Sequence, residues 1–148
     1  MMRNILLAIA MLLGASTVSP GFAQDRPAMT VWKSPSCGCC GNWVKHMEQA
    51  GFKVQVHNIE NLDGVKMSAR IPENLQSCHT AIVGGYTIEG HVPAADIERL
   101  LKEKPEVMGL AVPGMPSGSP GMENGEYDPY DVVTFTRQGE TGVFSSYK

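Results

Sequence analysis

Three of the four cysteines in the chain lie within four positions of one another. Cys37, Cys39 and Cys40 occur in the stretch SPSCGCCGNW, and the fourth is Cys78. A thiolate is the nucleophile in disulfide exchange and also a ligand of soft metal ions. The residue types and their spacing therefore suggest three chemistries: a structural disulfide, a redox cycle or a metal site.

The spacing also limits how these cysteines can pair. Adjacent cysteines rarely bridge each other because the ring they close is strained, so a Cys39–Cys40 bond is disfavoured. Cys37 and Cys40 form the easiest pair, which leaves Cys39 and Cys78 either as a second pair or as free thiols. Two inert disulfides fit poorly with cysteines crowded at the start of a helix.

The elements that must position the cysteines alternate between strand and helix. Hydrophobic periodicity and turn residues predict strands at 28–33, 52–57, 80–83, 86–89, 132–136 and 142–147, and helices at 42–50, 62–69 and 93–104. Proline and glycine recur through residues 105–130, which predicts a long irregular loop of the kind that is usually functional or disordered. The last two strands should form a C-terminal β-hairpin.

This order predicts an α/β, thioredoxin-like fold with the cysteine cluster between the first strand and the first helix. The helix dipole and free N–H groups at that position favour thiolate over thiol. Thioredoxin-like proteins place a cis-proline loop before the third strand, facing this turn. His79 occupies that position here, with Cys78 beside it, and a non-proline peptide bond is expected to be trans. Four thiols and one imidazole should therefore converge.

Four converging thiols favour a soft or borderline metal, either Cu(I) or Zn(II). A single tetrahedral zinc could take two ligands from the turn together with Cys78 and His79. However, Cys39 and Cys40 would be crowded around one ion, and bridging thiolates in a polynuclear Cu(I) cluster tolerate that crowding better. The sequence therefore favours copper, with zinc as the alternative.

Other candidate ligands are weaker. His79 could act as a ligand, a proton carrier or a neighbour of a ligand. Met115 and Met122 lie in the Gly/Pro-rich loop, where their thioethers could bind Cu(I), fill packing gaps or belong to a lid over the cluster. The remaining histidines are not expected to be ligands. We expect His46 to be a solvated helix residue, His57 to be a structural strand residue and His91 to cap the following helix.

The first residues have the pattern of a signal peptide. Arg3 precedes an apolar run at 5–13, and small residues at Gly21 and Ala23 suit cleavage after Ala23. We therefore expect a signal peptide at 1–23, a single domain at 24–148 and a periplasmic location. The formal net charge of −3 becomes −4 without Arg3, which argues against nucleic-acid binding. Nothing in the sequence suggests a membrane partner after cleavage.

Six segments of the chain resemble one known family. They are residues 32–41, 77–81, 84–86, 89–93, 109–116 and 118–123. They are similar to the CopG-type copper-resistance proteins, small exported metal-binding proteins that were formerly a domain of unknown function. The resemblance implies a thioredoxin-like fold, a redox role in copper handling and a multinuclear Cu(I) thiolate cluster whose ligands are Cys37, Cys39, Cys40 and Cys78.

The expected function is that of a periplasmic copper-binding protein of copper resistance that holds Cu(I) and interconverts copper oxidation states. Its expected partners are copper ions and other periplasmic copper-handling proteins. The sequence leaves open whether the protein is an enzyme, in the form of a copper-dependent oxidoreductase. The alternative function is a periplasmic thiol–disulfide oxidoreductase that uses Cys37 and Cys40, which the missing cis-proline makes less favourable.

Overall fold

A computed structural model describes residues 26–148, so the expected signal peptide at 1–23 lies outside the described residues. The strands are β1 (Met29–Lys33), β2 (Val54–Asn58), β3 (His79–Val83), β4 (Tyr86–Glu89), β5 (Gly109–Ala111), β6 (Tyr130–Phe135) and β7 (Thr141–Tyr147). The helices are α1 (Gly38–Gln49), α2 (Asp63–Ser68), α3 (Ala94–Glu103) and the short 3₁₀ turn η1 (Glu73–Leu75). Most predicted bounds are close to these, but α1 begins at Gly38 rather than at residue 42.

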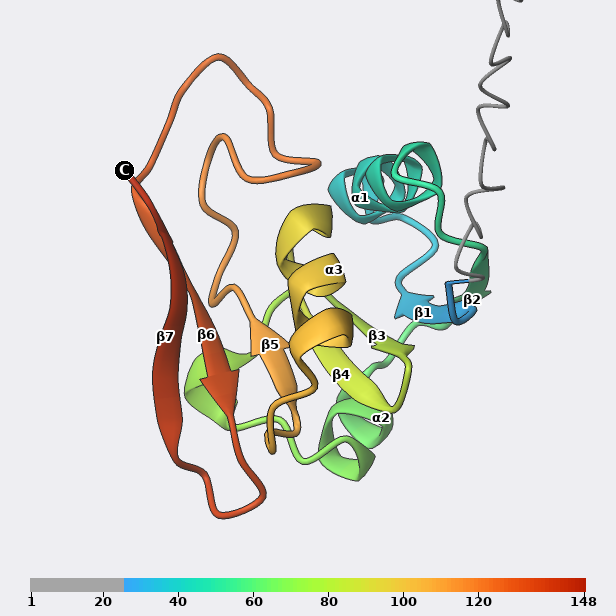
Figure 1. Cartoon of the computed structure of the whole chain (residues 1–148). Helices are drawn as coiled ribbons and strands as arrows, with labels where there is room; N and C mark the ends of the chain where they lie inside the picture. Colours follow the sequence, from blue (N-terminus) through green and yellow to red (C-terminus); the bar gives the residue numbers. More distant parts are fainter. Residues whose placement is uncertain (1–25) are drawn as a thin grey trace, which may run out of the picture.

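The strands form one mixed, seven-stranded sheet in the order β2-β1-β3-β4-β5-β6-β7 (Figure 1). β1 and β2 are parallel and are connected through α1, as the sequence predicts. β3 runs antiparallel to β1 and forms a hairpin with β4. The α/β class, the first parallel pair and the C-terminal hairpin of β6 and β7 are therefore confirmed.

Helices cover both faces of the sheet. Trp43 and Met47 of α1 and Ile97 and Leu100 of α3 pack with alternate residues of the strands in the main core. A second, smaller cluster occupies the other face: Ile71, Leu75, Ala111 and Phe135. Residues of one strand divide between these clusters because side chains alternate between the faces of a sheet. The cysteine-bearing end of α1 is thereby anchored on a rigid core.

The expected irregular segment at 105–130 is interrupted by a strand. β5 (Gly109–Ala111) pairs in parallel with β4 and antiparallel with β6, so it joins the C-terminal hairpin to the rest of the sheet. A Cβ atom on Gly109 would lie 1.7 Å from the carbonyl oxygen of Thr87, so the close strand pairing requires glycine there. Glycine is a poor strand former, which is why the sequence pattern hides this strand.

The C-terminal hairpin is held to α3 by a buried carboxylate. Asp96 is 4% exposed and accepts hydrogen bonds from Tyr147 Oη at 2.7 Å and from the Ser145 hydroxyl. Arg99 donates to the Phe144 carbonyl oxygen at 2.7 Å and lies over the Phe144 ring. These contacts hold β7 against α3, and Tyr147 of β7 pairs with Tyr130, where the loop between β5 and β6 ends.

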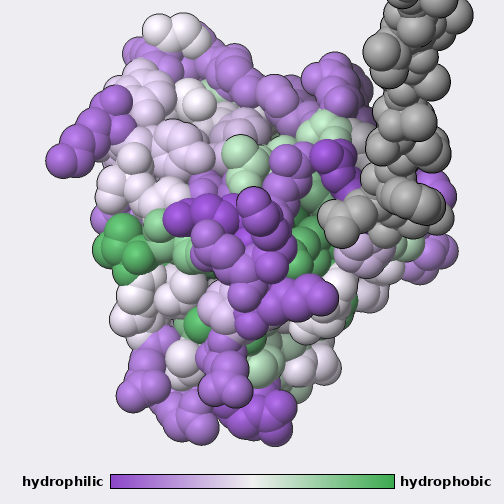
Figure 2. All heavy atoms as spheres, viewed as in Figure 1, coloured by the Kyte–Doolittle hydropathy of each residue, from purple (hydrophilic) through white to green (hydrophobic). Residues whose placement is uncertain are grey.

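Within residues 26–148, the exposed large hydrophobic side chains are Val56, Met67, Ile82, Met115, Tyr127 and Val143. On the face shown in Figure 2, hydrophobic residues appear as small areas separated by polar ones. Among residues 26–148, no helix has the length and apolar character needed to cross a membrane.

Candidate metal centre

The first turn of α1 carries three of the cysteines. The chain leaves β1 through a turn in which the Cys37 N–H donates to the Ser34 carbonyl oxygen at 3.1 Å. Cys37 is the N-cap of α1, and its sulfur accepts from the backbone N–H of Cys40 at 3.4 Å. A free N–H of the helix terminus thus points at a cysteine sulfur, which is the arrangement that stabilises a thiolate.

Cys37 and Cys40 are joined by a disulfide, as their spacing predicts, while Cys39 and Cys78 are free thiols. The Cys39 sulfur lies 3.5 Å from that of Cys37. Cys40 is fully buried, whereas the other three cysteines are partly exposed. The site therefore contains a bonded sulfur pair with two further sulfurs beside it.

Cys78 reaches the cluster from the segment before β3. The Cys40 sulfur lies 3.8 Å from the Cys78 carbonyl oxygen, and the sulfurs of all four cysteines lie within 4.8 Å of one another. The predicted convergence is thus confirmed. The peptide bond before His79 is trans, since residues 26–148 contain no cis bond.

Two buried histidines adjoin Cys78. The Nδ1 atom of His79 lies 3.3 Å from the Cys78 sulfur, and Nε2 of His91 lies 3.0 Å from it. Donor atoms of these three residues also lie within 4.8 Å of one another and form a second group able to hold a metal ion. His79 was a candidate from the sequence. The expectation that His91 caps the next helix is wrong, because α3 begins after Pro93 without a side-chain cap.

The position of His91 follows from the β3–β4 hairpin. Thr80 pairs with Glu89 across the two strands. Cys78, which precedes β3, and His91, which follows β4, therefore lie at the same end of this strand pair. A Cβ atom on the intervening Gly90 would lie 2.6 Å from the Ser77 side chain, so glycine is required for this close approach. The hairpin register was the signal in the sequence that could have identified His91.

Burial sets the protonation of this group. It raises the pKa of Cys78 to about 11, with nearby Cys39 adding to the effect, so the thiol is protonated at neutral pH. Burial lowers the pKa of His79 well below its usual value and also lowers the pKa of His91, so both imidazoles are neutral. Neutral imidazole is the form that binds metals, whereas the Cys78 thiol must lose its proton on binding.

Hydrogen bonds define the tautomer of His91. Its Nδ1–H donates to the Pro120 carbonyl oxygen at 2.8 Å, so Nε2 presents a lone pair to the Cys78 sulfur. Metal-binding histidines are typically oriented by such a bond from the other ring nitrogen. The Nε2 atom of His79 is buried and has no hydrogen-bond partner within residues 26–148. These features fit a site with soft sulfur and imidazole donors.

The loop between β5 and β6 packs beside the cluster, and Figure 1 shows it reaching α1. The Ser77 hydroxyl donates to the Gly114 carbonyl oxygen at 2.5 Å. A Cβ on Gly121 would lie 2.7 Å from the Cys39 carbonyl oxygen and 2.8 Å from the Trp43 nitrogen. His46 Nε2 lies 2.7 Å from a Glu123 carboxylate oxygen, so His46 contacts the loop instead of being only solvated.

The other residues singled out by the sequence have different positions. In the loop, the Met115 side chain is 53% exposed, whereas Met122 is partly buried. His57 is exposed on β2 and stacks on Trp32. Trp43 is fully buried and lies 4.4 Å from His79 between ring centroids. Trp43 therefore forms part of the apolar wall behind the histidines.

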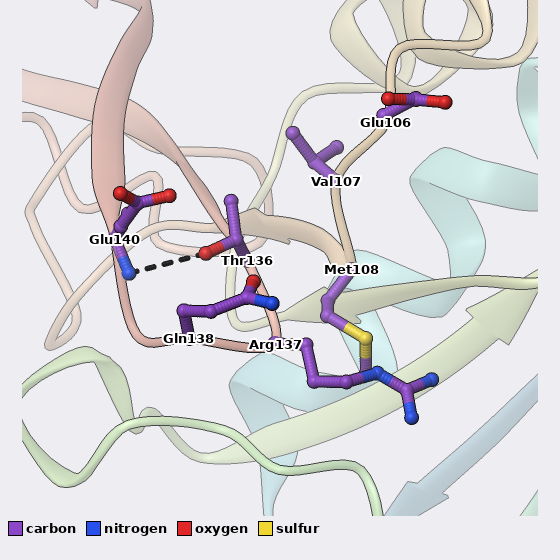
Figure 3. Close-up of a pocket in the computed structure, with 7 residues that line it drawn as sticks. All are labelled: Glu106, Val107, Met108, Thr136, Arg137, Gln138 and Glu140. Atoms are coloured by element: carbon purple, nitrogen blue, oxygen red, sulfur yellow. Dashed lines mark hydrogen bonds between the residues drawn. The ribbon is translucent and has the colours of Figure 1, made fainter.

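A pocket of about 290 Å³ lies away from the cysteines, beside the β6–β7 turn (Figure 3). No cysteine or histidine lines it; its lining residues are Glu106, Val107, Met108, Thr136, Arg137, Gln138 and Glu140. The candidate metal centre is thus identified by its donor atoms and not by a cavity.

Comparisons with known proteins agree with this geometry. The family described as protein of unknown function DUF411 matches residues 75–122, the part that contains Cys78 and His91. Two solved structures of copper resistance protein CopG, form 2 and form 1, have TM-scores of 0.79 and 0.78. Each is 46% identical and covers 82% of this chain and 98% of its own. No curated protein matches. Identity of this extent shows that the chain belongs to the family of copper resistance protein CopG.

Proposed function

We propose that this protein binds copper in copper resistance and holds Cu(I) in a multinuclear site made by Cys37, Cys39, Cys40 and Cys78. The observation that carries the proposal is the convergence of the four sulfurs within 4.8 Å. Thiolates are soft ligands that suit Cu(I), and bridging thiolates accommodate the adjacent Cys39 and Cys40. The role in resistance is supported by the relatives, which are named copper resistance proteins.

Imidazole and thioether donors complete the proposed site. His91 Nε2 is already oriented toward the Cys78 sulfur through its bond to Pro120. His79 offers a second imidazole beside the same sulfur. Met115 and Met122 supply thioethers in the adjoining loop, where soft sulfur again matches Cu(I). Zinc is the alternative metal, because tetrahedral cysteine and histidine sites are common for it.

The Cys37–Cys40 pair supplies electrons for copper chemistry. Two Cu(II) ions oxidise the two thiolates to one disulfide and are themselves reduced to two Cu(I) ions, so the two electrons balance. In this proposal the oxidised product is a Cys37–Cys40 disulfide, and the bond between these two residues in the structure supports such a pairing. Its formation removes two thiolate ligands, and so the redox state of the pair determines how many sulfurs remain for Cu(I). Turnover requires a dithiol reductant that restores the pair.

The proposed protein is a single thioredoxin-like domain at 24–148, exported to the periplasm by a signal peptide at 1–23. The sheet order β2-β1-β3-β4 and the cysteines at the start of α1 support the thioredoxin-like assignment. Its proposed partners are copper ions and other periplasmic copper-handling proteins. In this proposal the protein binds neither nucleic acid nor, after removal of the signal peptide, a membrane.

The test is an anaerobic Cu(I) titration of the fully reduced protein against a chromophoric chelator, with thiols counted before and after. Uptake of several copper ions per chain with all four thiols protected is the expected result. Uptake of one ion, or of none, while Cys37 and Cys40 remain reactive would refute the cluster.

The Cys37–Cys40 disulfide at the start of a helix favours a second candidate function, thiol–disulfide exchange. Such an oxidoreductase would reduce or oxidise a protein disulfide without metal and would depend on these two cysteines alone. A multiple-turnover exchange assay on the metal-free protein distinguishes the two functions, because in the copper mechanism the pair is re-oxidised by Cu(II) and so turns over only when copper is present.

A further inference from the structure

We propose that Glu89, paired with Lys66, is a positioning residue. Its carboxylate holds the Ser77–His79 segment so that Cys78 and His91 can bind copper together. This inference rests on the proposed copper site at Cys78. Glu89 does not bind copper in this account. It acts through the backbone of the residues that do.

Glu89 is fully buried at the end of β4, and three groups donate to its carboxylate. Oε1 accepts from the backbone N–H of Ser77 at 2.7 Å and from Lys66 Nζ at 2.5 Å. Oε2 accepts from the Thr80 hydroxyl at 2.7 Å. Ser77 and Thr80 stand on either side of Cys78 and His79, so one carboxylate fixes both ends of that dipeptide.

The same carboxylate also helps to position the turn that carries His91. Gly90 follows Glu89 directly, and its N–H donates to the His79 carbonyl oxygen at 3.0 Å. Gly90 has a φ of +73° and packs against the Ser77 side chain. The Glu89 clamp, defined here as Glu89 with Lys66, Ser77 and Thr80, therefore connects the segment bearing Cys78 to the turn bearing His91.

The clamp lies on the face of the sheet opposite α1. Ala81 and Ile88 point into the core beneath α1 and α3, so Thr80 and Glu89, which alternate with them, face the other way. Lys66 reaches Glu89 from α2 and is the only buried side chain of that helix. The carboxylate is thus separated from the sulfurs by the sheet, which makes it a support of the site rather than part of it.

Stability alone does not account for this ion pair. Burying two charges carries a large desolvation cost for each ion, and apolar residues of similar volume are often as stabilising. An apolar residue at position 89, however, could not accept a hydrogen bond from the Ser77 N–H. The directional bonds to Ser77 and Thr80 are what a carboxylate provides at this position and a hydrocarbon does not.

The first test uses double variants that leave no unpaired buried charge. Lys66→Met with Glu89→Leu removes the clamp, whereas Lys66→Met with Glu89→Gln keeps an acceptor for Ser77. Cu(I) affinity of the reduced proteins, measured by chelator competition, should fall about 10- to 100-fold in the Leu variant and be largely rescued in the Gln variant. The near-ultraviolet thiolate-to-copper band should change shape only in the Leu variant.

The matched control is Asp96→Asn, which perturbs another buried carboxylate with several donors, none of them on the Cys78 segment. This control should lower thermal stability and leave the copper spectrum unchanged. Parental affinity and spectrum in the Leu double variant would overturn the positioning role. An equal loss in the Gln and Leu variants would also overturn it, because the acceptor for Ser77 would then be irrelevant.

A metal-free readout separates this inference from the copper proposal. In a Cys39→Ser background with the Cys37–Cys40 disulfide intact, Cys78 is the single free thiol. Removing the clamp should raise its alkylation rate under native conditions several-fold, while the Gln variant should stay near the parent. If the parent binds no copper but this difference appears, the proposed function fails and the clamp stands. Identical alkylation rates would refute the clamp.

Discussion

Packing of the β5–β6 loop on α1 can be tested with two glycines that share one backbone conformation. Gly121 and Gly125 both have a φ of +89°, so alanine at either position costs about 1–2 kcal/mol in backbone strain. Only at Gly121 would the new Cβ collide, with the Cys39 carbonyl oxygen at 2.7 Å and the Trp43 nitrogen at 2.8 Å. Gly125 has no atom within 4 Å of that position and is the matched control.

The collision should move the loop away from α1 and break the bond between Pro120 and His91, which adds about 1 kcal/mol. Gly121→Ala should therefore lower the free energy of unfolding by about 2–3 kcal/mol, against about 1–2 kcal/mol for Gly125→Ala. The exposed contact between His46 and Glu123 adds little to the difference.

Urea denaturation of the metal-free proteins measures these free energies, and chelator competition then measures Cu(I) affinity. We expect weaker copper binding only for Gly121→Ala, since only that variant disturbs the orientation of His91. Equal destabilisation by the two substitutions, with unchanged copper binding in both, would show that the loop does not support the site.

Three further predictions follow from individual residues. Cys39→Ser should reduce the number of Cu(I) ions bound while leaving the Cys37–Cys40 disulfide, as a titration with thiol counting would show; unchanged stoichiometry would rule out the cluster. His91→Ala should weaken Cu(I) binding by at least about 10-fold, because it removes a proposed imidazole donor and the loss of an outer partner alone costs that much, whereas His57→Ala, an exposed histidine on β2, should leave binding unchanged. Burial raises the pKa of Tyr130 to about 12, and burial together with the bond to Asp96 raises that of Tyr147. Because the unfolded tyrosines ionise first, near their usual pKa of about 10, this stabilisation is complete below pH ~10 and is lost as pH rises toward the folded values. Tyr147→Phe should flatten the dependence of urea stability on alkaline pH, and an unaltered slope would contradict this assignment.

The cysteine cluster could be predicted because it depends on local order along the chain. A strand, a tight turn and a helix place Cys37, Cys39 and Cys40 together, and the sheet brings the start of β3 beside that turn. The same reasoning identified the Cys37–Cys40 disulfide. These relations follow from spacing and sheet topology and need no detailed packing.

The contribution of His91 could not be predicted in this way. It depends on a glycine turn that packs against Ser77 and on a carbonyl group from Pro120, far along the chain. β5 was missed for a related reason, since its three residues form a strand only because β4 and β6 flank them.

The Lys66–Glu89 pair was equally hidden. Lysine in a short polar helix and glutamate at a strand end ordinarily face solvent. Their burial results from how α2 lies over the sheet, which no local pattern of residues records. Tertiary contacts thus determine the residues around the cluster, whereas the cluster itself is evident from the sequence.

The central claim is that copper is bound by bridging thiolates in a multinuclear site, and X-ray absorption of the Cu(I)-loaded protein tests it most directly. We predict a first shell dominated by sulfur, together with scattering from neighbouring copper atoms that is lost or reduced in Cys39→Ser. A single copper with no copper neighbour, or a first shell made mainly of nitrogen and oxygen, would contradict the account.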